Sequence, residues 1–166
     1  MPHVREMPHV NVTVIGNAPT QEQKSALFSK ISNLLVTVLG PTRKLTLVSV
    51  RTEPATNWSV GGDEAEDAGL VGVEAVIRTV AGSSVQNRAR MIEETTTVLR
   101  EVLGTPILPL FVVMEEIAPE SWGYNGKTIA QIRAERGSGS FFRKDRRRVA
   151  ASMIAIPTIL TLAGDQ

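Results

Sequence analysis

The stretch PHVNVTVI, residues 8–15, decides the fold, because it has the pattern of a β-strand that begins with a proline. Valine recurs at every second position, and the side chains of a strand alternate between its two faces. The residue before this stretch is Met7. If Met7 is the translation start and is removed, Pro8 carries a free secondary amine at the head of the strand.

A free amine at this position has a chemical use. An α-amino group has a pKa near ~7.7–8, and an apolar pocket or nearby cations lower that pKa because both disfavour the ammonium form. Such an amine is a general base at neutral pH. The sequence offers two starts, because MPHV occurs at residues 1–4 and again at residues 7–10. From Met1 the free amine lies on Pro2, and Pro8 is an internal amide. We favour Met7, because Pro8 is in register with the strand.

The composition is typical of one globular domain. The chain has 166 residues, 42% of them hydrophobic and 21% charged, which is enough to bury a core. The net charge of +1 gives no reason to expect a nucleic-acid partner, and the absence of cysteine excludes disulfides, a thiolate nucleophile and zinc–thiolate sites. We see no signal peptide, and no segment reaches the ~20 apolar residues that span a bilayer. We expect a cytoplasmic protein.

The order strand, helix, strand is predicted twice. Strands at 8–15 and 45–50 flank the first helix, and strands at 70–80 and 110–117 flank the second. Each helix begins at a capping residue and ends at a glycine, and a loop with a tryptophan follows each unit. These landmarks share one offset of 64 positions: Thr20 and Ser84, Gly40 and Gly104, Trp58 and Trp122. The shared offset indicates a duplicated β-α-β unit.

We therefore predict an α/β (α+β) fold in which the two β-α-β units form a four-stranded sheet with two helices on one face. A helical crossover makes the strands of each unit parallel. Apolar residues on both sides of the first strand predict that the chain oligomerises through its sheets. On the second helix, we predict that the inner face is formed by Ile92, Leu99, Val102 and Leu103.

The predicted organisation has five parts: an N-terminal extension (1–7), a first unit (8–62), an acidic linker (63–69), a second unit (70–132) and a C-terminal tail (133–166). The tail joins a basic run to an apolar stretch at 149–162, which is too short to span a membrane. Resting on an anionic membrane surface is one alternative for it. Packing on the oligomer, or remaining poorly ordered, is the alternative that we favour.

With these features, the sequence resembles the tautomerase superfamily of oxalocrotonate tautomerase, in the fused form that joins two β-α-β halves in one chain. The resemblance covers about residues 8 to 130 and is carried by the Met-Pro start, by QEQK at 21–24, and by the paired loops 57–62 and 121–126. It implies a homotrimer of fused chains. It also implies an N-terminal proline that moves protons in keto-enol conversions of a small-molecule substrate.

The resemblance also assigns roles to individual residues. The catalytic proline of the family falls on Pro8, or on Pro2 if Met1 is the start, and the second half has Gly72 at the matching place. The aromatic wall of the family's pocket falls on Trp58 and Trp122. The two arginines of the family are absent: one position falls on Ala18 or Pro19, and the other falls on Leu47, with Phe111 as its counterpart. Their absence argues against a dicarboxylate substrate, because two carboxylates require two cationic or bidentate partners.

Arg78 and Arg51 are the candidates to replace the missing arginines. Arg78 lies in an otherwise apolar strand, where a charge is costly unless it is paired. It either binds a substrate carboxylate or only pairs with Glu74 or Glu115 across a subunit contact. Arg51 has the alternative of being a surface strand end. Tyr124 could donate a proton to an enolate oxygen, or it could be a loop residue at a subunit seam.

We accordingly predict a tautomerase-like isomerase in which Pro8 removes a proton next to a carbonyl and returns it at another carbon. Neither a metal nor an organic cofactor is expected, because hydrogen bonds and a cation can stabilise an enolate. One alternative is a decarboxylase or dehalogenase on the same fold. The other is a noncatalytic oligomeric scaffold in which the six residues before Met7 block the proline.

Overall fold

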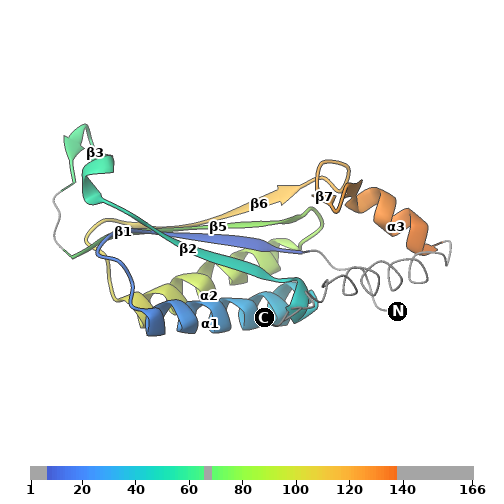
Figure 1. The fold of residues 1–166 in the computed structure, drawn as a ribbon, viewed down its shortest axis with the longest axis horizontal. Helices are drawn as coiled ribbons and strands as arrows, with labels where there is room; N and C mark the ends of the chain where they lie inside the picture. Colours follow the sequence, from blue (N-terminus) through green and yellow to red (C-terminus); the bar gives the residue numbers. More distant parts are fainter. Residues whose placement is uncertain (1–6, 66–68, 138–166) are drawn as a thin grey trace, which may run out of the picture. The chain divides into compact units, whose positions relative to one another are not determined.

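A computed structural model of the chain describes residues 7–65 and 69–137 (Figure 1). These residues form two compact units, one up to Trp122 and one from Gly123 onward. The predicted N-terminal extension except Met7, the middle of the linker and the tail beyond residue 137 lie outside the described residues. The apolar stretch at 149–162 is therefore not described.

The first unit contains a four-stranded sheet in the order β2-β1-β5-β6. β1 (His9–Gly16) is parallel to β2 (Leu47–Glu53), and β5 (Leu70–Val80) is parallel to β6 (Leu110–Ile117). The two halves meet where β1 pairs antiparallel with β5. Asn11 pairs with Val76, and Val12 pairs with Ala75. The 64-position offset matches Asn11 to Ala75 and Val12 to Val76, so it converts the first pair into the second. A local two-fold axis therefore relates the two halves. The prediction of a duplicated β-α-β fold is confirmed.

Two helices, α1 (Gln21–Leu39) and α2 (Val85–Leu103), cover the same face of this sheet (Figure 1). The predicted capping box is present: the Gln23 N–H donates to Thr20 Oγ1 at 3.1 Å, and the Thr20 N–H donates to Gln23 Oε1 at 2.9 Å. α1 ends at Gly40, whose left-handed φ of 77° suits a residue without a side chain. Gly104 ends α2, as predicted.

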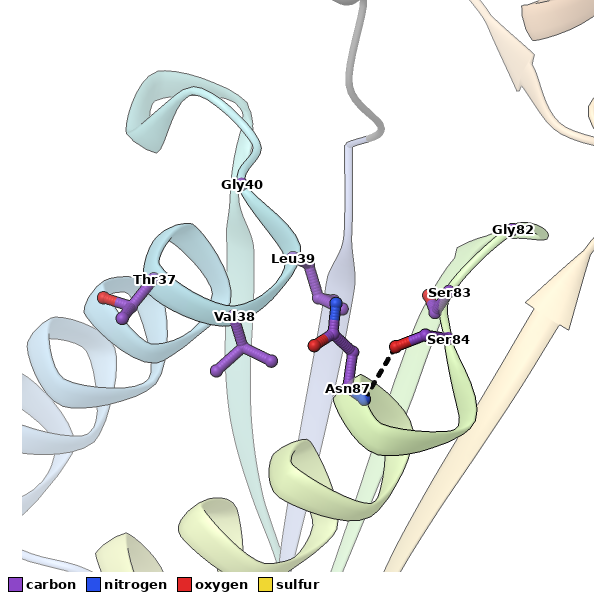
Figure 2. A pocket seen from close by; sticks show the side chains of 8 residues that line it. All are labelled: Thr37, Val38, Leu39, Gly40, Gly82, Ser83, Ser84 and Asn87. Carbon is purple, nitrogen blue, oxygen red and sulfur yellow. Dashed lines mark hydrogen bonds between the residues drawn. The ribbon is translucent and has the colours of Figure 1, made fainter.

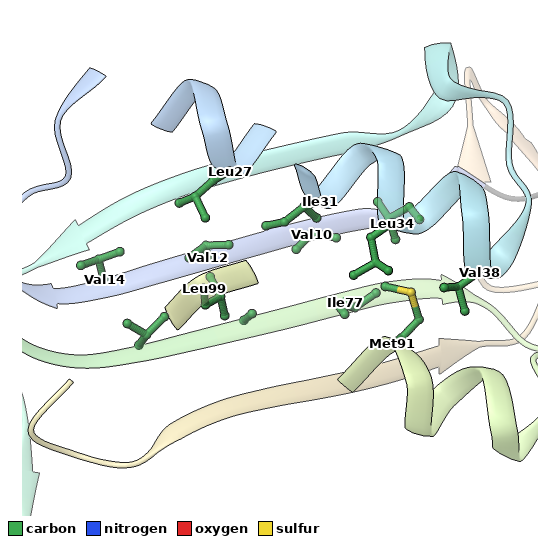
Figure 3. Packing of buried hydrophobic residues seen from close by; sticks show 13 residues of the cluster. Val10, Val12, Val14, Leu27, Ile31, Leu34, Val38, Ile77, Met91 and Leu99 are labelled. Atoms are coloured by element: carbon green, nitrogen blue, oxygen red, sulfur yellow. The ribbon is translucent and has the colours of Figure 1, made fainter. Parts of the chain in front are cut away.

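The core lies between the helices and the sheet (Figure 3). β1 contributes Val10, Val12 and Val14, which are all fully buried. The buried stripe of α2 runs through Met91, Thr95 and Leu99, which are spaced by four residues. The prediction of Ile92 on the inner face is wrong, because Met91 takes that place and Ile92 is 39% exposed. Leu99 is fully buried, as predicted, and Val102 and Leu103 pack at the margin of the core.

Thr95 provides a test of this packing. Its side chain is fully buried, and among the described residues its hydroxyl oxygen has no hydrogen-bond partner. A buried hydroxyl without a partner is destabilising, because it loses its hydrogen bonds to water on folding. We expect Thr95→Val, which keeps the shape, to raise the free energy of unfolding by about 1 kcal/mol. Urea denaturation measures this, and a lower midpoint for Thr95→Val would contradict it.

The face of the sheet away from α1 and α2 is partly apolar. Val48 and Val50 of β2, and Val112 of β6, pack into the core, so the alternate residues of these strands point to the other side. Leu47 is 60% exposed, Phe111 59% and Val113 40%. Leu47 and Phe111 are related by the 64-position offset, so the duplication repeats this feature.

The shorter elements correct several predicted boundaries. β2 was predicted over 45–50, but residues 43–45 form a one-turn helix (η1, Arg43–Leu45), and β2 extends to Glu53 because it pairs with β1 along its length. After the one-turn helix η2 (Ala55–Asn57), β3 (Ser59–Val60) pairs with β4 (Asp63–Glu64). The first two residues of the predicted linker therefore belong to a hairpin.

The second unit is described by itself. Its strands β7 (Gly123–Tyr124) and β8 (Lys127–Thr128) form a hairpin around Asn125 and Gly126, which both have positive φ. α3 (Ile129–Gly137) follows, so residues 133–137, the start of the predicted tail, are helical. Within the ranges that the structure describes, no helix has both the length and the apolar character needed to cross a membrane.

Candidate active site

Pro8 lies at the head of β1 and is buried. Its carbonyl oxygen accepts a hydrogen bond from the Leu47 N–H at 3.0 Å, which ties the proline to β2. The next residue, His9, pairs with Leu47 on one side and with Arg78 on the other, and Arg78 pairs with Glu115. We call the end of the sheet marked by this row the proline end.

Arg78 is held by a carboxylate within its own chain. Its Nε lies 2.6 Å from Glu115 Oε2, and the two side chains are 35% and 44% exposed. The two residues are direct neighbours on parallel strands, so the register of the sheet creates the pair. Of the predicted partners, Glu115 is the one found, and it comes from the same chain. Both side chains lie on the face away from the helices, because Met114 of β6 packs into the core.

A second ion pair lies at the proline end on the helix side. Arg88 of α2 donates through its Nη1 to Glu116 Oε2 at 2.8 Å and to the Ser83 carbonyl oxygen at 2.9 Å. The Ser83 N–H donates to Glu116 Oε1 at 2.8 Å. Sequence reasoning missed Arg88. The 64-position offset matches it to Lys24, but only the antiparallel pairing of β1 and β5 brings the start of α2 to this end.

The surroundings of Glu116 change its pKa. Burial by itself would raise its pKa, but hydrogen bonds from the backbone and hydroxyl of Ser83, the charge of Arg88 and the backbone N–H of Gly82 together bring the pKa below its ordinary value. The ionised carboxylate therefore fixes the segment between β5 and α2.

This shift has a consequence for stability against pH. Because folding lowers the pKa of Glu116, its stabilising effect is present above the unfolded pKa of about 4.3 and is lost as the pH falls through the folded pKa. We expect Glu116→Gln to lower the free energy of unfolding by about 1 kcal/mol at pH 7. The difference from the unmodified chain should shrink below about pH 4. Urea denaturation from pH 3 to 7 measures it, and a gap that is constant with pH would contradict it.

The structure separates the two tryptophans. β6 ends at Ile117, which pairs with Val80 at the proline end, and Trp122 follows five positions later. Trp58 instead follows β2, which ends beside Ile15 at the opposite end of the sheet. There Trp58 packs against a buried cluster of Ile15, Ala55 and Val71. Within one chain, Trp122 therefore follows a strand that ends at the proline end, and Trp58 follows a strand that ends at the opposite end.

Arg51 and Tyr124 lie in different parts of the structure. Arg51 pairs with Thr13, four residues along β1 from His9, a distance of about 13 Å at about 3.3 Å per residue. Within one chain, Arg51 is therefore removed from Pro8 along the sheet. Tyr124 lies in the second unit and is 43% exposed.

At the opposite end of the sheet, Gly72 is packed closely against Ile15. A Cβ built on Gly72, the counterpart of Pro8, would lie 2.9 Å from Ile15 Cδ1 and 3.7 Å from Leu108 Cβ. A larger residue there needs Ile15 to move. The space that a ring would need is thus occupied by apolar packing.

A polar hollow of about 330 Å³ lies between the end of α1 and the start of α2 (Figure 2). Its walls are Thr37 to Gly40 on one side and Gly82 to Ser84 with Asn87 on the other. The Ser84 hydroxyl is already used, since it accepts from the Asn87 N–H at 3.1 Å. None of the predicted site residues lines this hollow. Among residues 7–65 and 69–137, no group of three or more histidine, aspartate or glutamate side chains is placed to hold a metal ion.

Parts of the chain are similar to known proteins. Residues 8–68 and 75–132 match the family described as Tautomerase enzyme. The chain belongs to the tautomerase family. The two matched segments are the two β-α-β units, so the chain is a fused member of this family in which the repeat occurs twice.

Individual tautomerase relatives agree with this assignment. Probable tautomerase K2 of Dickeya dadantii (strain 3937) is 35% identical over 57 residues, which cover 34% of this chain and 85% of the relative. A structure of native fused 4-OT has a TM-score of 0.67 at 21% identity and covers 75% of this chain and 98% of its own. A structure described as a wild-type symmetric trimer of fused 4-OT has a TM-score of 0.63 at 21% identity, with coverage of 73% and 95%. These two likenesses show the tautomerase fold.

Proposed function

We propose that this chain is an isomerase that uses a free Pro8 amine as a general base for keto-enol proton transfer on a small carbonyl or carboxylic acid substrate. The observation that carries the proposal is the position of Pro8. It is buried at the head of β1, and the neighbouring strand carries Arg78 opposite the next residue, His9. Burial disfavours an ammonium ion, so an amine at this place is suited to be neutral and basic at pH 7.

The neighbouring residues have distinct parts in this mechanism. The neutral Pro8 nitrogen takes a proton from the carbon next to the carbonyl and returns it at a second carbon, so one group acts first as base and then as acid. Arg78 holds an acidic group or the enolate oxygen of the substrate, because its guanidinium is a fixed cation. Trp122 supplies an apolar wall. Tyr124 and Arg51 remain predicted contacts, and Trp58 remains a predicted wall.

We further propose that the active form is a homotrimer. The apolar residues on the face away from the helices, Leu47, Phe111 and Val113, are 60%, 59% and 40% exposed in one chain. Contact with other copies would cover them. In such an assembly, Trp58 and Arg51 of one chain can approach the proline end of another. Location in the cytoplasm stays a prediction.

A second candidate function is decarboxylation or dehalogenation of a small carboxylic acid. One observation favours it: the proline end holds two carboxylates, Glu115 and Glu116, each next to an arginine. A carboxylate beside a cation can position a water molecule, and a protonated Pro8 would act as the acid. Both carboxylates are engaged by their arginines, so proton transfer by Pro8 alone is the simpler reaction for this site.

The decisive experiment compares a chain that begins at Pro8 with one that begins at Met1, using phenylenolpyruvate as the substrate. The isomerase proposal expects activity that depends on the free Pro8 amine. A scaffold would show no activity in either form. A decarboxylase or dehalogenase would release carbon dioxide or halide from a matching acid while leaving phenylenolpyruvate unchanged.

A further inference from the structure

Glu115 is positioned to set the charge of the candidate site. On the face away from the helices, the two rows of the sheet nearest to Pro8 contain one arginine, Arg78, and one carboxylate, Glu115, together with His9. The other positions of these rows are uncharged: Leu47, Ser49, Asn11, Val76 and Val113. The positive charge of Arg78 is therefore already balanced on this face.

Glu115 contacts Arg78 through one guanidinium nitrogen, Nε, at 2.6 Å. A guanidinium also carries donors on its two terminal nitrogens. Those donors can hold one carboxylate. A second carboxylate would meet the negative charge of Glu115, and like charges in a partly buried site repel each other.

We propose that Glu115 is a specificity-determining residue, which by neutralising Arg78 restricts the Pro8 site to carbonyl substrates with at most one carboxylate. This inference rests on the proposed isomerase function and deepens it. Glu115 acts through Arg78 and the local charge, so it is a positioning residue rather than a catalytic one.

The test uses two probes that differ by one charge: phenylenolpyruvate and its analogue with a carboxylate at the para position of the ring. We expect the unmodified chain, beginning at Pro8, to prefer the monocarboxylate. In Glu115→Gln, kcat/KM for the dicarboxylate should rise about 10-fold relative to that for the monocarboxylate, mainly through a lower KM, because one negative charge has been removed near Arg78. The gain should shrink as salt is added, because ions screen partly exposed charges.

Two further variants control for structural effects. Glu94→Gln removes one carboxylate from an Arg–Glu pair on α2, where Glu94 contacts Arg90, and should leave the ratio of the two substrates unchanged. The double variant Arg78→Gln with Glu115→Gln again removes both charges of the pair and should restore the preference of the unmodified chain. A merely structural role of Glu115 would not produce this return.

The outcomes separate this inference from the proposed function. If the unmodified chain isomerises phenylenolpyruvate but Glu115→Gln leaves the substrate ratio unchanged, the inference is wrong and the isomerase proposal stands. If no variant has activity, the isomerase proposal fails, and calorimetric binding of phenylpyruvate and 4-carboxyphenylpyruvate decides the inference. Equal affinity ratios in the unmodified chain and in Glu115→Gln would overturn it.

Discussion

A chain that begins at Pro8 is expected to isomerise phenylenolpyruvate with a kcat/KM at least about 100-fold above that of a chain whose Pro8 is preceded by other residues, since general-base catalysis contributes about 10² to 10⁴. The physical reason is that an amide nitrogen has no available lone pair, whereas the free secondary amine does. The rate should rise with pH through the pKa of this amine, because only its neutral form accepts a proton.

Pro8→Ala in the shortened chain is the matched control. Alanine keeps an α-amino group but replaces the secondary amine by a primary one and removes the ring that is buried at the head of β1. We expect a loss of about 10² in kcat/KM, with the fold retained by circular dichroism. A shortened chain no more active than the longer one would remove Pro8 from the mechanism. Full activity of the longer chain that disappears in Pro2→Ala would move the catalytic amine to Pro2.

A second large effect is expected from a substitution on the face of the sheet away from the helices. Phe111→Asp should convert the proposed trimer into monomers, a three-fold drop in mass by light scattering, and should abolish the isomerase activity with it. Phe111 is 59% exposed in one chain, and burying a phenylalanine stabilises a contact by about 1.5 to 3 kcal/mol. A buried, unpaired aspartate would replace this gain with a desolvation cost, and a trimer repeats the change three times.

Val85→Asp controls for the added charge. Val85 is 67% exposed at the first position of α2, where an acidic side chain is compatible with the helix dipole. The mass of this variant should equal that of the unmodified chain. If Phe111→Asp keeps the full mass, or if the unmodified chain is already a monomer, the proposed assembly through this face is incorrect.

The sequence alone was sufficient to predict the four long strands, the two long helices and the duplication. Alternating valines define β1, and capping residues and glycines limit the helices, because these signals act over a few residues. The strand boundaries at 70–80 and 110–117 agree with β5 and β6. The misplacement of Ile92 shows the limit of this reasoning: Met91 and Ile92 are both apolar, and only contact with the sheet decides which one is buried.

The candidate site depended on contacts between residues far apart in the chain. The antiparallel pairing of β1 with β5 brings Arg88 to the proline end and leaves Trp58 and Arg51 farther along the sheet, toward its opposite end. The register of β5 and β6 joins Arg78 to Glu115. Local patterns do not encode which strands become neighbours or in which register, because that choice is made by burial of the whole apolar face. The sequence thus determined the main elements and indicated Pro8, and the tertiary structure decided which charged residues lie at the same end of the sheet.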